Sequence, residues 1–208
     1  MKVHTILFDL GNVVIDLDEQ RLYREFADLA GLSVSEILEK AQKALFFNDL
    51  ETGSISENEF RDGLRGLLNA AELTDERVDD AWNSILLKID PALVEMIAKL
   101  KAHYQIMVLS NTNSIHARKF HQLLAAVSPY QHLDELFHHV YLSHQIGERK
   151  PDLASWQFIL DRHPALKPSD ILFLDDRSEN LEGAKSLGIA VQQIHHPGET
   201  MELMRKII

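Results

Sequence analysis

Apolar positions along this chain change their spacing twice, and each spacing predicts a different kind of structure. The chain begins with an apolar run of strand length, Val3 to Phe8, which is interrupted only by His4 and Thr5. The run ends at a carboxylate, Asp9, and the residues Gly11-Asn12 that follow are typical of a turn. The pattern therefore predicts a buried strand with an acidic side chain at its carboxyl end.

Between residues 19 and 88 the apolar positions recur at helical spacing instead. Leu22, Phe26 and Leu29 would lie on one face of a first helix, which Gly31 ends. Three further helices are expected to begin at polar capping sequences: Ser33 to Glu36, Ser56 to Glu59, and Thr74 to Glu76. The stretch Leu50 to Ser54 predicts a turn, and no part of residues 19–88 predicts a strand.

Beyond Asp90-Pro91, apolar runs of strand length alternate with helical patterns. We expect strands over residues 106–109, 140–142, 171–174 and 189–194, and helices over residues 92–102, 114–124, 153–161, 179–187 and from about 199. This alternation is typical of right-handed βαβ units on a parallel sheet. The sequence therefore predicts an α/β protein with a doubly wound parallel core, residues 1–15 and 89–208, and an inserted all-helical cap at about residues 16–88.

Composition narrows the class of protein and of partner. The chain has 208 residues, 45% of them hydrophobic, which is enough for one good core and a small second one. Its formal charge of −11, with no long basic cluster, argues against nucleic acid and anionic membranes as partners. The absence of cysteine excludes disulfides and thiolate metal sites. With no signal peptide or membrane-spanning apolar run in view, we expect a cytoplasmic protein, and the sequence leaves the oligomeric state open.

Polar side chains near the predicted strand ends suggest a shared site. Besides Asp9 they are Ser110, Asn111, Lys150, Asp175, Asp176 and Asn180. The carboxyl ends of parallel strands meet at one edge of a sheet, where α/β proteins bind ligands. Carboxylates gathered there would repel one another unless a hard cation such as Mg²⁺ lay between them. A hydroxyl, main-chain N–H groups and a lysine suit a phosphoryl group, which a carboxylate can attack as nucleophile.

These motifs resemble the haloacid dehalogenase superfamily, in the branch with a helical cap of the C1 type inserted after the first motif. The four matching motifs are Phe8-Asp9-Leu10-Gly11, Leu109-Ser110-Asn111, Lys150-Pro151, and Asp175-Asp176 with Asn180. They span nearly the whole chain in the family's order. Within the family, shorter stretches such as Gly147 to Pro151 and Gly53 to Phe60 are similar to bacterial alpha-D-glucose-1-phosphate phosphatases. The resemblance implies a Rossmann-like core and hydrolase activity.

The resemblance also implies roles in catalysis and phosphate binding. Asp9 would be the nucleophile, and Lys150 would pair with both Asp9 and the phosphate. Ser110 and Asn111, together with nearby main-chain amides, would hold the phosphoryl oxygens. The partner would be a small phosphorylated metabolite.

A further set of roles concerns the metal. Asp176, an oxygen of Asp9 and the main-chain carbonyl of Gly11 would bind Mg²⁺. Asp175 would lie behind these ligands, and Asn180 would orient the loop or a water of the metal.

The chain departs from the family pattern at Gly11. Most phosphatases of this group carry an aspartate at that position as general acid and base, a role worth about 10²–10⁴ in rate. The similar glucose-1-phosphate phosphatases share the glycine, and an anomeric oxygen leaves with less need of protonation. Asp16 and Asp18 could replace the missing acid, although we favour a role for them in leading into the first cap helix.

We therefore expect a magnesium-dependent phosphatase that hydrolyses a small phosphomonoester, such as a hexose 1-phosphate, through an aspartyl-phosphate on Asp9. A 2-haloacid dehalogenase is an alternative, but it needs no metal and would gain nothing from the pair Asp175-Asp176. A regulatory or phosphate-binding protein of the same fold is favoured only by Gly11. A phosphomutase depends on the missing acid and fits the sequence least.

Overall fold

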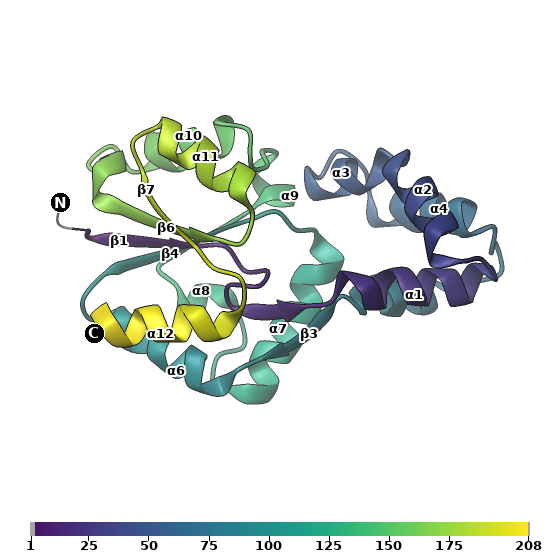
Figure 1. Cartoon of the computed structure of the whole chain (residues 1–208), viewed down its shortest axis with the longest axis horizontal. Helices are drawn as coiled ribbons and strands as arrows, with labels where there is room; N and C mark the ends of the chain where they lie inside the picture. The colour runs from purple at the N-terminus through teal and green to yellow at the C-terminus, as the bar shows by residue number, and fades with distance from the viewer. Residues whose placement is uncertain (1–2, 208) are drawn as a thin grey trace.

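A five-stranded parallel sheet forms the centre of the computed structural model, which describes residues 3–207 (Figure 1). The strand order is β5-β4-β1-β6-β7. The strands are β1 (Thr5–Phe8), β4 (Gln105–Ser110), β5 (His139–Leu142), β6 (Ile171–Asp175) and β7 (Ala190–Gln193). Because β1 lies in the middle and pairs in parallel with both β4 and β6, its carboxyl end is flanked by two other strand ends. The predicted α/β class is confirmed.

Helices cover both faces of this sheet. Ile6 and Phe8 of β1 face one apolar cluster, whereas Leu7 between them faces another. The first cluster includes residues of α6 (Pro91–Leu100), α7 (Ser114–Val127), α8 (Leu133–Leu136) and α12 (Pro197–Ile207), and the second includes residues of α10 (Ala154–Arg162) and α11 (Ser178–Ser186). Strands buried on both faces explain the nearly continuous apolar runs of the sequence. No helix within residues 3–207 is long and apolar enough to cross a membrane.

Five helices inserted after β1 form a separate apolar cluster around Phe60 and Trp82. They are α1 (Glu19–Ala30), α2 (Val34–Gln42), α3 (Phe46–Glu51), α4 (Glu57–Leu68) and α5 (Asp75–Asn83). Both expected capping boxes are present, at Ser33 and Ser56, and each satisfies main-chain N–H groups at a helix start. The inserted helices lie beyond the carboxyl edge of the sheet (Figure 1).

Two short strands connect the inserted helices to the sheet. β2 (Ile15–Leu17) pairs antiparallel with β3 (Leu86–Ile89) where the chain leaves the core and returns. The expectation of no strand within residues 19–88 is therefore wrong at residues 86–88. The run Ile85 to Ile89, apolar except for Lys88, is too short to show a period and resembles a continuation of the helix before it.

The expected turn at residues 50–54 is also partly wrong. Leu50 and Glu51 belong to α3, and the turn follows at residues 52–54. Gly53 has a φ of +69°, and a Cβ there would lie 2.4 Å from the main-chain oxygen of His144. Glycine is required at this point because the inserted segment touches the backbone of α9 (Ser143–Ile146).

Candidate active site

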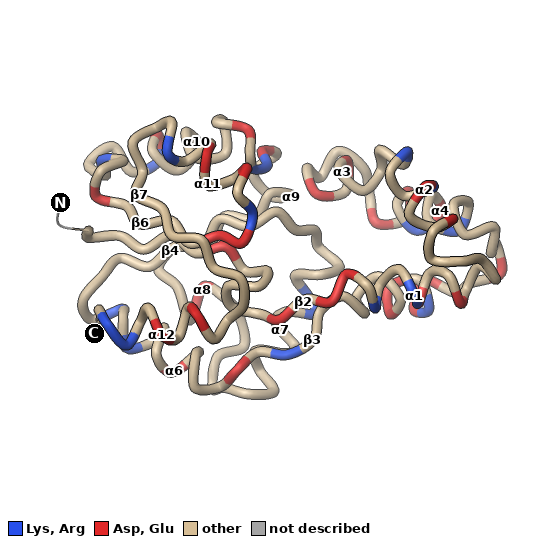
Figure 2. Tube along the Cα trace, in the orientation of Figure 1, with Lys and Arg blue, Asp and Glu red and all other residues tan. Residues whose placement is uncertain are grey.

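The predicted polar residues meet at the carboxyl edge of the sheet. Asp9 follows β1, Ser110 ends β4, Asp175 ends β6, and Asp176 comes next. Lys150 reaches the same place from the loop after α9 rather than from a strand end. Figure 2 shows acidic segments from separate parts of the chain meeting near the ends of the central strands. A cavity of about 320 Å³ lies between this edge and the inserted helices.

Lys150 is an almost fully enclosed charge of the site, with a relative exposure of 1%. Its Nζ lies 2.6 Å from Oδ2 of Asp175 and 3.0 Å from Oδ1 of Asp9. Burial alone would lower the pKa of Lys150, but the charges of Asp9 and Asp175 oppose this, and the net shift is upward. The lysine therefore stays protonated between two carboxylates.

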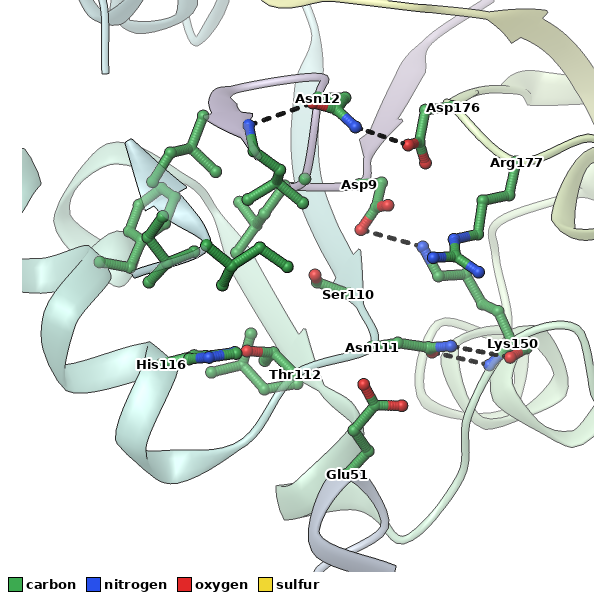
Figure 3. Close-up of a pocket in the computed structure, with 18 of the residues that line it drawn as sticks. Asp9, Asn12, Glu51, Ser110, Asn111, Thr112, His116, Lys150, Asp176 and Arg177 are labelled. Carbon is green, nitrogen blue, oxygen red and sulfur yellow. Dashed lines mark hydrogen bonds and ion pairs between the residues drawn. The ribbon is translucent and has the colours of Figure 1, made fainter. Parts of the chain in front are cut away.

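Asn111 holds the main chain of Lys150 in place. Its side-chain Oδ1 accepts from the Lys150 N–H at 2.9 Å, and its Nδ2 donates to the Lys150 carbonyl at 2.8 Å. The Asn111 amide is thus directed at the lysine loop, as Figure 3 shows, and its main chain is the part left for a ligand. Ser110 is placed differently, because its hydroxyl lies in the cavity close to Asp9 in the same view.

Asp175 and Asp176 are neighbours in sequence with different surroundings. Both oxygens of the fully buried Asp175 accept hydrogen bonds, from Lys150, from the side chain of Asn180 and from the N–H of Arg177. Asp176 lines the cavity, and its side chain accepts one bond, from Asn12 at 2.9 Å. Asp175 is therefore committed to holding the site together, whereas Asp176 has oxygen lone pairs to offer a ligand.

Asp9, Asp175 and Asp176 place three carboxylate oxygens within 4.8 Å of one another. Burial raises the pKa of Asp9 to about 6, with Lys150 opposing the rise and the two other carboxylates adding to it. Sites built only from oxygen donors, with excess negative charge and access to a cavity, suit Mg²⁺. The residues present therefore fit a magnesium ion.

Asn12 is a site residue that sequence reasoning treated only as part of a turn. It adopts a left-handed conformation with a φ of 53°, which asparagine tolerates better than most residues. Its Oδ1 accepts from the N–H of Leu17 at 3.1 Å, and its Nδ2 donates to Asp176. Asn12 therefore links the carboxylate of Asp176 to β2, the strand that leads into the inserted helices.

Gly11 lies in the cavity wall where an acid would be expected. Its φ is not in the left-handed region, so the backbone does not demand glycine. A Cβ at this position would instead lie 2.6 Å from Cδ1 of Leu17. The side chain of Leu17 thus occupies the space that an acid at position 11 would need.

Titratable groups from other elements line the cavity, but Asp16 does not. His116 stacks on Trp82 at 4.6 Å and donates from Nε2 to the Trp82 carbonyl. Burial lowers the pKa of His116 to about 4, so the ring is neutral near neutral pH, and its one N–H is bound to the Trp82 carbonyl. The inserted helices contribute Glu19 and Glu51, and each forms an ion pair with an arginine of the core.

A family model for haloacid dehalogenase-like hydrolases matches residues 3–188. A D-ribitol-5-phosphate phosphatase from Bacteroides thetaiotaomicron is 32% identical over 197 residues, which are 92% of this chain and 91% of that protein. The chain belongs to the haloacid dehalogenase-like hydrolase family.

Solved structures agree with this assignment. A family enzyme from Bacteroides thetaiotaomicron, in complex with magnesium and inorganic phosphate, is 30% identical, has a TM-score of 0.80, and is matched over 92% of this chain and 93% of its own. A family hydrolase from Porphyromonas gingivalis is 29% identical with a TM-score of 0.86, over 100% of this chain and 98% of that one.

The burial of Asp9 beside two other carboxylates leads to a prediction for the free energy of unfolding of Asp9→Asn in the metal-free protein. A carboxyl with a higher pKa in the folded protein than the ordinary 3.8 binds its proton more tightly when folded. Ionised Asp9 therefore costs stability, and the cost grows as the pH rises from about 4 to about 6. We expect the variant to be more stable than the parent by about 1–3 kcal/mol at pH 7 and equal to it near pH 4.

Urea unfolding in excess chelator at both pH values measures this difference. A variant less stable than the parent at pH 7 would show that the Lys150 ion pair outweighs the burial of Asp9.

Proposed function

We propose that this protein is a magnesium-dependent phosphatase that hydrolyses a small phosphomonoester through an aspartyl-phosphate on Asp9. The observation that carries the proposal is that the two oxygens of the Asp9 carboxylate differ in their partners. Lys150 binds Oδ1, while Oδ2 has no hydrogen-bond partner within residues 3–207 and lies at the cavity. One oxygen is thus oriented by a fixed cation and the other is available as nucleophile.

Three groups around Asp9 suit a phosphoryl group. The Ser110 hydroxyl and the main-chain N–H of Asn111 would donate to its oxygens, and the Lys150 ammonium would offset its negative charge. Oδ2 of Asp9 would form a bond to phosphorus as the ester P–O bond breaks. Water would then attack the phosphorus of the aspartyl-phosphate, releasing phosphate and restoring the carboxylate.

Asp176, Asp9 and the main-chain carbonyl of Gly11 would hold the metal, and Asp175 would position Lys150 behind them. When bound, Mg²⁺ would neutralise carboxylate and phosphate charge. The relative that binds magnesium and phosphate supports this part of the proposal. The acid pair Asp175-Asp176 also argues against the metal-free dehalogenase alternative.

The substrate we propose is a phosphate ester of a small hydroxylated molecule. A hexose 1-phosphate was the expectation from sequence, and the curated relative named for D-ribitol 5-phosphate widens the class to acyclic polyols. The cavity of about 320 Å³ is of the size that holds a small metabolite.

The role of Asp9 is tested with Asp9→Asn, because an amide fills the same space but is a far weaker nucleophile. Phosphate release from p-nitrophenyl phosphate in Mg²⁺ should fall at least about 10³-fold. The matched control is Asp16→Asn, whose side chain does not line the cavity and which should stay within about threefold of the parent. Equal activity of Asp9→Asn and the parent would remove Asp9 from the nucleophile role.

Substitutions at the acid pair should separate metal binding from stability. Asp176→Ala should weaken Mg²⁺ affinity about 10- to 100-fold with little change in unfolding, since this side chain accepts a single bond. Asp175→Ala should destabilise the fold by about 3–5 kcal/mol, because it leaves the buried Lys150 with one carboxylate fewer. Calorimetric titration with Mg²⁺ and urea unfolding measure the two effects, and the opposite pattern would reverse the assignment.

Gly11 leads to a kinetic prediction. Without an acid at this position, we expect hydrolysis of the aspartyl-phosphate to limit turnover for good leaving groups, so rapid-quench assays should show a burst of one p-nitrophenol per site. The double variant Gly11→Asp/Leu17→Ala, which makes room for the acid, should remove the burst by speeding the second step about 10-fold or more. A linear time course in the parent would show that another group transfers the proton.

A further inference from the structure

The leaving group of the proposed reaction must point toward the inserted helices. In phosphoryl transfer the attacking and leaving oxygens lie roughly in line with phosphorus between them. Asp9 attacks from the sheet edge, and the inserted helices lie across the cavity from that edge (Figure 1). Groups on that side of the cavity therefore contact the alcohol part of the substrate rather than the phosphate.

Two acidic side chains face the cavity from that side, Glu19 and Glu51. Glu19 pairs with Arg177 at the exposed rim, where both side chains are more than half accessible. Glu51 pairs with Arg149, and these side chains are only 25% and 29% exposed. Figure 3 shows the Glu51 carboxylate directed from α3 toward Asn111 and Ser110. Glu51 is therefore the acid better placed to meet a bound substrate.

The geometry of this pair leaves one oxygen of Glu51 free to accept. Nε and Nη2 of Arg149 both donate to Oε2 of Glu51, at 3.2 and 2.8 Å. Within residues 3–207, neither Oε1 of Glu51 nor Nη1 of Arg149 has a partner. A hydroxyl group of a bound substrate can donate to the free Oε1.

We propose that Glu51, held by Arg149, determines specificity by accepting a hydrogen bond from a hydroxyl of the leaving group. The proposal rests on the phosphatase function and narrows its substrate class to esters of polyols and sugars. The free Oε1 of Glu51 disfavours an alkyl leaving group. When such a group enters the cavity, the carboxylate loses its bound water and gains no hydrogen-bond donor in return. The carboxylate also repels a leaving group that carries its own negative charge.

Three esters of the same length test this directly: glycerol 3-phosphate, n-propyl phosphate, which lacks the hydroxyls, and 3-phosphoglycerate, in which a carboxylate replaces the terminal hydroxymethyl group. We expect the parent to prefer them in that order by kcat/KM. Glu51→Gln should lower kcat/KM for glycerol 3-phosphate about 10- to 100-fold, because the amide oxygen stays with Arg149 and the amide nitrogen that takes the place of Oε1 cannot accept from a hydroxyl. It should raise kcat/KM for 3-phosphoglycerate, since the variant no longer places a negative charge against the substrate carboxylate.

The matched control is Glu25→Gln, which breaks an ion pair with Arg77 inside the inserted helices and away from the cavity. This variant should leave the order of preference among the three esters, and the ratios of their kcat/KM values, unchanged. If Glu51→Gln lowers kcat/KM for all three esters by the same factor, the Glu51–Arg149 ion pair only holds the inserted helices against the core. That result overturns the proposal. A parent that releases phosphate from no ester in Mg²⁺ would instead overturn the phosphatase function itself.

Discussion

The buried ammonium of Lys150 is the interaction on which the site depends. Three carboxylates at one sheet edge repel one another, and the lysine bridges two of them at 2.6 and 3.0 Å. A buried charge is tolerated only when it is paired and hydrogen-bonded, and the site meets that condition through Asp175, whose oxygens are all occupied. The same arrangement leaves one oxygen of Asp9 and the carboxylate of Asp176 available to ligands.

The inserted helices reach this edge through polar contacts as well as apolar packing. Glu57 of α4 accepts from Ser114 and Arg118 of α7, and chiefly the Arg118 hydrogen bond lowers the pKa of Glu57 to about 2. Glu51 meets Arg149, the residue before the buried lysine. The position of the inserted helices is thereby linked to the loop that carries Lys150.

Sequence patterns predicted the sheet and the meeting of polar side chains at its carboxyl edge because each signal is local. Asp9, Ser110 and Asp175 follow apolar runs, and parallel strands place such ends together whatever the details of packing. The β2 and β3 strands were missed because three or four residues cannot show a period. The bonds of Asn12 to Asp176 and of Glu51 to Arg149 join residues 164 and 98 positions apart. They depend on side-chain conformations that no local pattern encodes.

Chemical trapping of an aspartyl-phosphate shows whether Asp9 is the nucleophile. The parent protein, mixed with p-nitrophenyl phosphate and Mg²⁺, is quenched in the pre-steady state and treated with borohydride, which reduces an acyl phosphate to the alcohol. Peptide mass spectrometry then locates the product. We expect homoserine at position 9, dependent on substrate and absent from the positions of the other aspartates. Rapid phosphate release with no reduction at position 9, or reduction at a different aspartate, would contradict this expectation.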